Sequence, residues 1–529
     1  MKKAIFVFLS ILMPAVSFAS DKGLDQKIDE AFKPVSDFIS GIVFFEVFDG
    51  APFVIILLVC SALFFTIYFG FPNIRFFGKA INVVRGKYDH VDHPSAGNAD
   101  LAIDGDIKDT ISDESKEGEV THFQALATAV SGTVGNGNIA GVALAIALGG
   151  PGATFWMVVC GLIGMSSKFV ECTLGVQYRD IGEDGTVYGG PMYYLSKGLK
   201  EKGFAMLGKV TAVLFAIFCI GGSFGGGNAA QSNQATIVLK ELMGWDSSSA
   251  GAIIGLVLAI LVGIIIIGGI KRIASVTEKV VPFMAVLYLV ACLYIILSNF
   301  SLVDDAFSLI FREAFNPQAI GVGGVIGVLL VGFKRAAFSN EAGAGSASIA
   351  HSAVKTKYSA SEGLVALLEP FIDTVVICTM TALVIIIYNF GGAFEYGGAG
   401  SVMIDGVAYE GAGITSKAFG QYIPYSNVFL TVAVVLFAVS TMISWSYYGL
   451  QSWKYLFGRG KAADLTYKML FLTFVVIGAA ASMDSIWGFS DAMIFAMVFP
   501  NMIGLFFLFP VVKKELGRYL SAIKNNKEG

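Results

Sequence analysis

Charged side chains are scarce in this sequence: only 14% of the 529 residues are Asp, Glu, Lys or Arg, whereas 55% are apolar. Soluble domains carry about 25% charged residues, so a water-soluble fold of this length is excluded. The net charge of −4 excludes a nucleic-acid-binding protein, and the 62 glycines follow no Gly-X-Y period, which excludes collagen. A polytopic membrane protein remains.

Catalytic and metal-binding motifs are also missing. The six cysteines lie inside apolar runs, without a CxxC pair or a histidine at metal-ligand spacing. HExxH, GxSxG and P-loop motifs are absent from the sequence, so we expect neither an enzyme nor an ATP-driven pump. The acids and histidines between Asp89 and His93 are interpreted as part of a solvated loop. We therefore expect no cofactor.

The amino terminus has the pattern of a secretory signal peptide. Residues 1–19 combine two lysines, an apolar stretch and small residues before a cleavage site at Ala19. The alternative is a short first helix that is not cleaved. Cleavage would leave residues 20–49 as a partly amphipathic segment on the periplasmic face of a bacterial inner membrane.

Long apolar stretches fill most of the remaining chain. A helix needs about 20 apolar residues to cross the hydrocarbon core, and eleven stretches are long enough. The predicted cytoplasmic segments contain 25 Lys and Arg residues against six outside, which places the tail of residues 513–529 in the cytoplasm. The stretches lie near residues 50–72, 122–149, 152–178, 207–237, 249–270, 276–298, 318–352, 361–389, 426–452, 465–482 and 488–512.

Ten of these helices divide into two groups of five. We treat residues 50–72 as a peripheral span and residues 73–121 as a cytoplasmic loop. Because five helices cross the membrane an odd number of times, the groups at residues 122–298 and 318–512 begin on opposite sides. This is the condition for an inverted repeat.

The first helix of each group contains a Gly-rich polar break. Residues 131–138 read SGTVGNGN, and residues 338–346 read FSNEAGAGS. An opened backbone in hydrocarbon costs several kcal/mol for each unpaired group, so it is tolerated where it binds a polar ligand. Close helix packing is the alternative, but it does not explain the two Asn in the first break or the Asn-Glu pair in the second.

Several long motifs resemble the alanine/glycine:cation symporter family, which is also called the sodium:alanine symporter family. They follow the family's order between about residues 50 and 512, with one departure at Val158, where a second Trp is common. The resemblance implies an all-α polytopic fold with a five-plus-five inverted repeat of the leucine-transporter type and one extra span. It also implies sodium-driven uptake of alanine and glycine by alternating access. The motifs are GTVGNGNIAGVALAIALGGPGATFWM (132–157), GGPMYY (189–194), GGIKRIASVTEKVVPFMAVLY (268–288), RAAFSNEAGAGSASIAH (335–351) and SWSYYG (444–449).

An amino acid bound at the breaks would need donors for its carboxylate. We predict that the carboxylate binds the N–H groups of Gly135, Asn136 and Gly137, at the positive end of the following half-helix. Side-chain hydrogen bonds from Thr133 and Asn138 would support it. The other predicted substrate-binding residues are Gln231, Ser339, Asn340 and Trp445.

Family analogy also implies a sodium site between the first break and the helix at residues 426–452. Sodium prefers oxygen ligands, and Val134, Ser440 and Thr441 are the predicted cation-binding residues. The alternative for the two hydroxyls is a bond back to a carbonyl of their own helix.

Two acids at membrane depth are candidates for coupling or for structural roles. Such acids are costly, so Glu341 and Asp373 are singled out. Glu341 would contact the substrate or ion, or else pair with Arg335 or Lys334. Two further charged residues, three positions apart in the helix at residues 152–178, are predicted to pair with each other: Lys168 and Glu171.

The residues alone leave other transport mechanisms open. A proton-coupled symporter is the main alternative, and an ion channel is disfavoured because channels usually need a pore built from several subunits. The expected partners are alanine or glycine, sodium and the lipid bilayer, with no nucleic acid. The choice of amino acid and the oligomeric state, a monomer included, are not fixed by the sequence.

Overall fold

The computed structural model describes most of the chain. The predicted signal peptide of residues 1–19 lies outside the described residues, and so does His93 of the predicted solvated loop. The described residues are 24–48, 50–92, 118–182, 185–316, 324–398 and 400–525.

Helices dominate these residues, which confirms the predicted helical, polytopic fold class. By length and composition, seven helical segments in the described part of the chain are able to cross a membrane, or eight if one bent pair counts as a span. The bent pair consists of α7 (His122–Thr133) and the segment Gly137–Gly149, which comprises η3 (Gly137–Gly141) and α8 (Val142–Gly149). The other seven are α9 (Gly152–Gln177), α12 to α13 (Ala205–Met243), α15 (Gly269–Ser298), α19 to α21 (Ser359–Asn389), α23 (Ser426–Phe457), α24 (Lys461–Ala480) and α25 (Met483–Asn525).

Three further apolar helices complete the predicted set. They are α3 (Phe53–Tyr68), α14 (Ala250–Ile266) and α17 (Gly324–Asn340), each of which is 16 or 17 residues long. Each of the eleven predicted stretches thus falls on helix. The number that span the bilayer, and the limits of the predicted domains, stay predictions.

Short helices and two-stranded ribbons connect the long helices. The predicted cytoplasmic loop begins with α4 (Pro72–Arg75), α5 (Phe77–Val84) and α6 (Asp89–Asp92), and α16 (Val303–Phe315) follows α15. The three ribbons are antiparallel. They pair β1 (Glu46–Phe48) with β2 (Ala51–Pro52), β3 (Asp180–Ile181) with β4 (Val187–Tyr188), and β5 (Ser401–Ile404) with β6 (Val407–Glu410).

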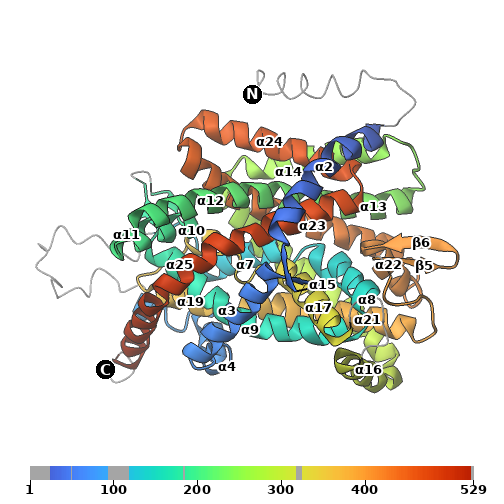
Figure 1. Ribbon diagram of the computed structural model, residues 1–529, viewed down its shortest axis with the longest axis horizontal. Coiled ribbons are helices and arrows are strands. Elements are labelled where there is room, and N and C mark those ends of the chain that lie inside the picture. The colour runs from blue at the N-terminus through green and yellow to red at the C-terminus, as the bar shows by residue number, and fades with distance from the viewer. Residues whose placement is uncertain are drawn as a thin grey trace, which may run out of the picture.

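The helix α2 (Leu24–Val43) runs along the outside of the bundle. Its residues were expected to be only partly amphipathic, but they form a 20-residue helix that packs against α25 and α24. Ser40 fixes this contact because its hydroxyl donates to the Gly488 carbonyl of α25 at 3.0 Å. Figure 1 shows α2 and α25 crossing the face of the molecule, with α14 and α24 together at one side.

The two broken helices lie in the interior. Residues 129–143 of the first and 335–354 of the second are buried, and α9, α15 and α23 pack around them. The helix α7 begins with a capping box, in which the Thr121 hydroxyl accepts from the Gln124 N–H and the Gln124 side chain accepts from the Thr121 N–H. The polar breaks therefore occupy the centre of the helical bundle.

Buried charges connect helices that are distant in sequence. The predicted pair of Lys168 and Glu171 is wrong: the Lys168 ammonium contacts Glu369 of α20 (Leu368–Pro370) at 3.0 Å, and Glu171 accepts from Asn501 of α25 at 2.9 Å. Both residues face neighbouring helices, which is why their spacing along α9 does not predict their partners.

Candidate binding site

The first break opens between α7 and η3. The axes of the two segments differ by 51°, and residues 134–136 join them. Gly135 is needed there because a Cβ atom would lie 2.4 Å from the Thr441 hydroxyl oxygen. The predicted interruption of this helix is confirmed.

The protein itself satisfies most of the opened backbone. The Gly135 N–H donates to Asn138 Oδ1 at 2.9 Å, and the Asn136 N–H donates to Gln231 Oε1 at 2.9 Å. Two of the three N–H groups predicted for a carboxylate are therefore occupied. The N–H of Gly137, the first residue of η3, has no acceptor among the described residues. The predicted carboxylate site is thus reduced to one free backbone donor.

The second break follows α17, which ends at Asn340. Glu341 has φ of 55°, an uncommon value for a residue with a side chain, and the glycines at 343 and 345 have φ near 90°. Asn340 caps the open end because its Oδ1 accepts from the Ala342 N–H at 3.0 Å. A short helix, α18 (Ser348–His351), follows the break. This predicted break is also confirmed.

The two breaks meet at the centre of the molecule. A Cβ atom on Gly137 would lie 3.6 Å from the Ser339 Cβ, so the two backbones are in contact. Asp373 joins them: it accepts from Asn138 Nδ2 at 2.6 Å and from the Ser339 hydroxyl at 3.0 Å. Asp373 belongs to η8 (Phe371–Cys378), a π-helical segment between α20 and α21 (Thr379–Asn389).

A small cavity remains where the breaks meet. Its volume is about 10 Å³, room for about one water molecule. Phe338 and Ile494, which the sequence did not single out, also contribute to its wall. The predicted residues that line the cavity are Thr133, Gly137, Gln231, Ser339, Glu341 and Trp445. The other residues predicted to bind substrate form hydrogen bonds within the protein around the cavity; they are Gly135, Asn136, Asn138 and Asn340.

Trp445 closes one wall of this cavity, as predicted. Its indole N–H donates to Glu341 Oε1 at 2.9 Å, and the Ser346 hydroxyl donates to Glu341 Oε2. The alternative pairing of Glu341 with Arg335 or Lys334 is wrong, because both of those residues contact an acid of α25. Space for the indole comes from the glycines of η5 (Gly225–Ala229), where a Cβ on residue 227 would lie 2.1 Å from the ring.

The two predicted cation-binding hydroxyls point to different neighbours. The Thr441 hydroxyl donates to the Ser131 carbonyl at 3.0 Å and so lies beside the first break. The Ser440 hydroxyl donates to its own helix at the Phe437 carbonyl and lies 3.4 Å from the Met284 sulfur of α15. Ser440 therefore meets the break through its backbone alone: its carbonyl accepts from the Ser131 hydroxyl at 2.8 Å, whereas its own hydroxyl is directed elsewhere. Val134 is placed there as the residue that ends α7.

The sequence predicted Gln231 only as a substrate-binding residue and gave no indication of its role in capping the first break. It also gave no indication of a role for Thr374. Gln231 lines the cavity and also caps the first break, because its Oε1 accepts from the Asn136 N–H, while its Nε2 donates to the Gly226 carbonyl of η5 at 2.9 Å. Thr374 connects the second break to Asp373: its hydroxyl accepts from Asn340 Nδ2 at 2.9 Å and donates to Asp373 Oδ2 at 2.7 Å. Neither role has a local pattern in the sequence.

Comparisons with known proteins give a consistent result. The model of the sodium:alanine symporter family matches residues 38–529. The sodium/alanine symporter AgcS of Methanococcus maripaludis is 38% identical over 491 residues, which cover 92% of this chain and 99% of the relative. A probable sodium/glutamine symporter of Bacillus subtilis, GlnT, is 34% identical over 410 residues, covering 77% and 80%. The crystal structure of MhsT in complex with L-phenylalanine aligns with 76% of this chain and all of its own, at 14% identity and a TM-score of 0.48.

Proposed function

The chain belongs to the sodium:alanine symporter family, and from this premise we propose that it imports alanine or glycine together with sodium by alternating access. Family membership makes the protein a membrane transporter rather than an enzyme. The resemblance stated from the sequence motifs is thereby confirmed. The amino acid, the coupling ion and the residues that hold them belong to the proposal.

The contact between the two breaks is the observation that carries the proposal. Gly137 supplies a free N–H at the start of a half-helix, where a carboxylate is favoured. The Glu341 and Asp373 carboxylates lie close by and are suited to an ammonium group. The cavity between them is small and is walled by Trp445 and Phe338. Because the cavity has room for only about one water molecule, it must widen to admit an amino acid, and a short side chain requires less widening than a long one.

Sodium is proposed to bind beside the first break. The Thr441 hydroxyl and the Val134 carbonyl are the oxygen ligands that we assign. The Thr441 hydroxyl of α23 contacts the last turn of α7 at the Ser131 carbonyl, and Val134 is the residue that directly follows α7. A hard cation prefers such oxygens to nitrogen or sulfur. Ser440 is left out of the proposed site because its hydroxyl faces α15.

Proton coupling is the second candidate, and one observation favours it. Asp373 is fully buried and accepts only from neutral donors, without a cationic partner among the described residues. A carboxyl in such a place is able to take up and release a proton during transport. Sodium remains the primary proposal because of the family.

Orientation in the membrane is also proposed. The mature amino terminus would be periplasmic and the carboxyl terminus cytoplasmic, in a bacterial inner membrane, on the basis of the Lys and Arg distribution. The predicted domain limits and the inverted repeat of residues 122–298 and 318–512 are part of the same proposal.

Uptake into proteoliposomes tests the proposed function. Radiolabelled alanine uptake is measured with an inward sodium gradient, with an inward proton gradient in sodium-free buffer, and with no gradient. We expect accumulation only with the sodium gradient, and we expect unlabelled glycine to compete. Accumulation with the proton gradient alone would select the second candidate, and equal flux under all conditions would indicate a facilitator or a channel. Liposomes without protein are the control.

A further inference from the structure

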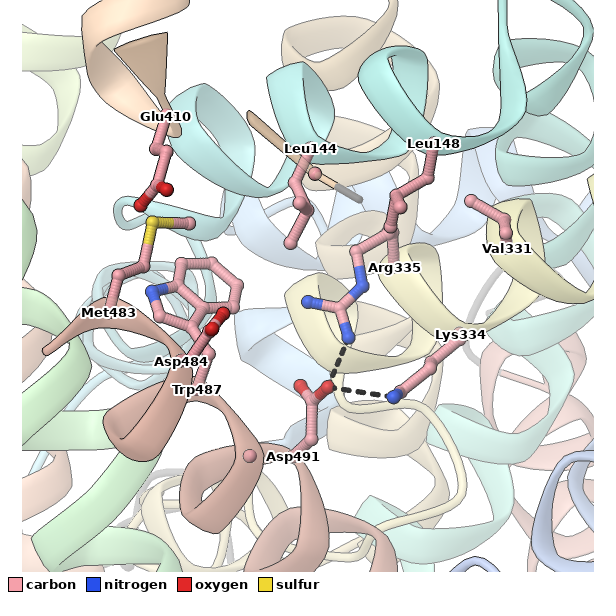
Figure 2. Close-up of a pocket in the computed structure, with 12 residues that line it drawn as sticks. Leu144, Leu148, Val331, Lys334, Arg335, Glu410, Met483, Asp484, Trp487 and Asp491 are labelled. Carbon is pink, nitrogen blue, oxygen red and sulfur yellow. Dashed lines mark hydrogen bonds and ion pairs between the residues drawn. The ribbon is translucent and has the colours of Figure 1, made fainter. Parts of the chain in front are cut away.

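A second cavity lies one turn away from the central one. It has a volume of about 250 Å³ and lies between the end of α8, the second half of α17 and the beginning of α25 (Figure 2). Its wall contains Arg335, four residues before Ser339 of the central cavity, which is about 6 Å along the helix. In the proposed topology this outer pocket faces the periplasm.

Three charged residues form one side of the outer pocket. Lys334 and Arg335 both contact the same oxygen of Asp491, Lys334 at 3.1 Å. Two cations therefore share one carboxylate, which leaves an excess positive charge. Figure 2 shows this cluster facing the pocket from α17 and α25.

Two buried donors in this pocket have no acceptor. Arg335 Nη1 and the Trp487 indole N–H are both buried without a hydrogen-bond partner among the described residues, and each residue is 4% exposed. The guanidinium is held in place because it lies over the Phe338 and Trp487 rings, 5.5 and 5.4 Å from their centres. Buried donors are normally paired, and these two are left without a partner in the described part of the chain even though Asp491 Oδ1 in the same pocket is also unpaired. A bound anion would supply the acceptor that they lack.

Two acidic side chains also line the pocket. Glu410, at the end of β6, and Asp484, in the first turn of α25, are both exposed and both line it. Partial burial and the negative charge of Asp484 raise the pKa of Glu410. In Figure 2 Glu410 lies apart from the Arg335 cluster, near Met483, whereas Asp484 lies beside the Trp487 ring.

We propose that the outer pocket is a second subsite for the transported amino acid, which binds the carboxylate through Arg335 and Trp487 and the ammonium through Asp484 and Glu410. This inference rests on the proposed function. A zwitterion carries both charges that the two sides of the pocket complement. The stacked Phe338 and Trp487 rings, 5.1 Å apart, lie between this subsite and the central cavity.

Counting bound alanine tests the subsite. Binding of radiolabelled alanine to the purified full-length protein is measured to saturation in sodium buffer. We expect two equivalents for the wild type and one for Trp487→Phe, which keeps a six-membered aromatic ring but loses the N–H together with the pyrrole part of the indole. Arg335→Lys, which keeps the charge and loses the free Nη1, is expected to weaken the second equivalent about tenfold. It serves as the second variant if Trp487→Phe does not fold.

Two matched variants separate the possible outcomes. Trp453→Phe removes another buried indole N–H without a partner among the described residues, on α23, and should keep both equivalents. Gly137→Val obstructs the central cavity and should keep the outer equivalent alone.

A wild type that transports alanine but binds one equivalent overturns the subsite and leaves the proposed function standing. No binding at all overturns both. If Trp487→Phe and Arg335→Lys both bind alanine as the wild type does, the subsite is also overturned.

Discussion

Asn138 stabilises the first break from within. Its Oδ1 accepts from the Gly135 N–H at 2.9 Å, and its Nδ2 donates to Asp373 at 2.6 Å. The sequence suggested that this amide faces the ligand, but the structure uses both of its polar atoms inside the protein. Asn138 therefore positions the backbone of the break and the carboxylate that joins the two breaks.

We expect Asn138→Ala to lower the initial rate of alanine uptake about tenfold or more, because a buried donor and a buried carboxylate lose their partner. Radiolabelled uptake at matched expression measures the effect. Asn233→Ala is the control, since that amide is also buried but donates to the Gly478 and Ala481 carbonyls, away from the breaks. Near-normal uptake by Asn138→Ala would show that the first break is not part of the transport site.

The contrast between Thr441 and Ser440 gives a second prediction. We expect Thr441→Ala to raise the sodium concentration for half-maximal uptake about tenfold, the effect of losing roughly 1.4 kcal/mol of ligand binding. Ser440→Ala should leave that concentration unchanged, because its hydroxyl faces Met284 of α15. Equal sodium dependence in the two variants would contradict the proposed ion site.

At the scale of elements, the two broken helices were predictable and their partners were not. Gly and Asn inside an apolar run mark a helix that cannot continue, and this local signal located both breaks. The acceptor for the Asn136 N–H is Gln231, 95 residues away, and no sequence pattern connects them. The π-helical form of η8, which turns Asp373 toward the breaks, likewise depends on packing.

The error at Lys168 has the same cause. The i,i+3 rule describes neighbours on an exposed helix surface, where no other helix competes for the charge. On α9 both Lys168 and Glu171 are buried against other helices, so tertiary contacts decide their partners.

Breaking the buried ion pair between Lys168 and Glu369 should destabilise the protein. We expect Lys168→Met to lower the free energy of unfolding by about 3–5 kcal/mol, because Glu369 is left as a buried charge with one cationic partner fewer. Thermal unfolding in detergent measures the change. Lys197→Met is the matched control: Lys197 lies 3.6 Å from Asp180 in an exposed pair, for which a loss of at most about 1 kcal/mol is expected. Equal melting temperatures for the two variants would contradict this account.

At the scale of the whole molecule, the apolar surface matches a protein surrounded by lipid. Large apolar side chains are exposed along the outer faces of α14 and α15, where a soluble protein would place charges. Examples are Val257, Ile260, Ile264, Phe283, Val286 and Val290. The polar side chains gather instead at the centre, around the two breaks.

Both sides of this centre are closed in the structure. Toward α17 and α25, the Phe338 and Trp487 rings separate the central cavity from the outer pocket. On the opposite side, Glu362 of α19 (Ser359–Ala366) holds His122 of α7 and His351 of α18, the latter at 2.5 Å. In the proposed alternating-access cycle these two barriers would open in turn.

The central claim is that the two breaks meet and hold the substrate between them. A Gly137→Cys, Ser339→Cys pair tests it directly, because the two Cβ positions are 3.6 Å apart, within the range of a disulfide. The six native cysteines are replaced first, since Cys378 lies 3.7 Å from the Ser339 hydroxyl. The rate of oxidative cross-linking is then measured with and without alanine and sodium. We predict rapid cross-linking that alanine and sodium together slow; no cross-link, or a rate that alanine and sodium leave unchanged, would contradict the account.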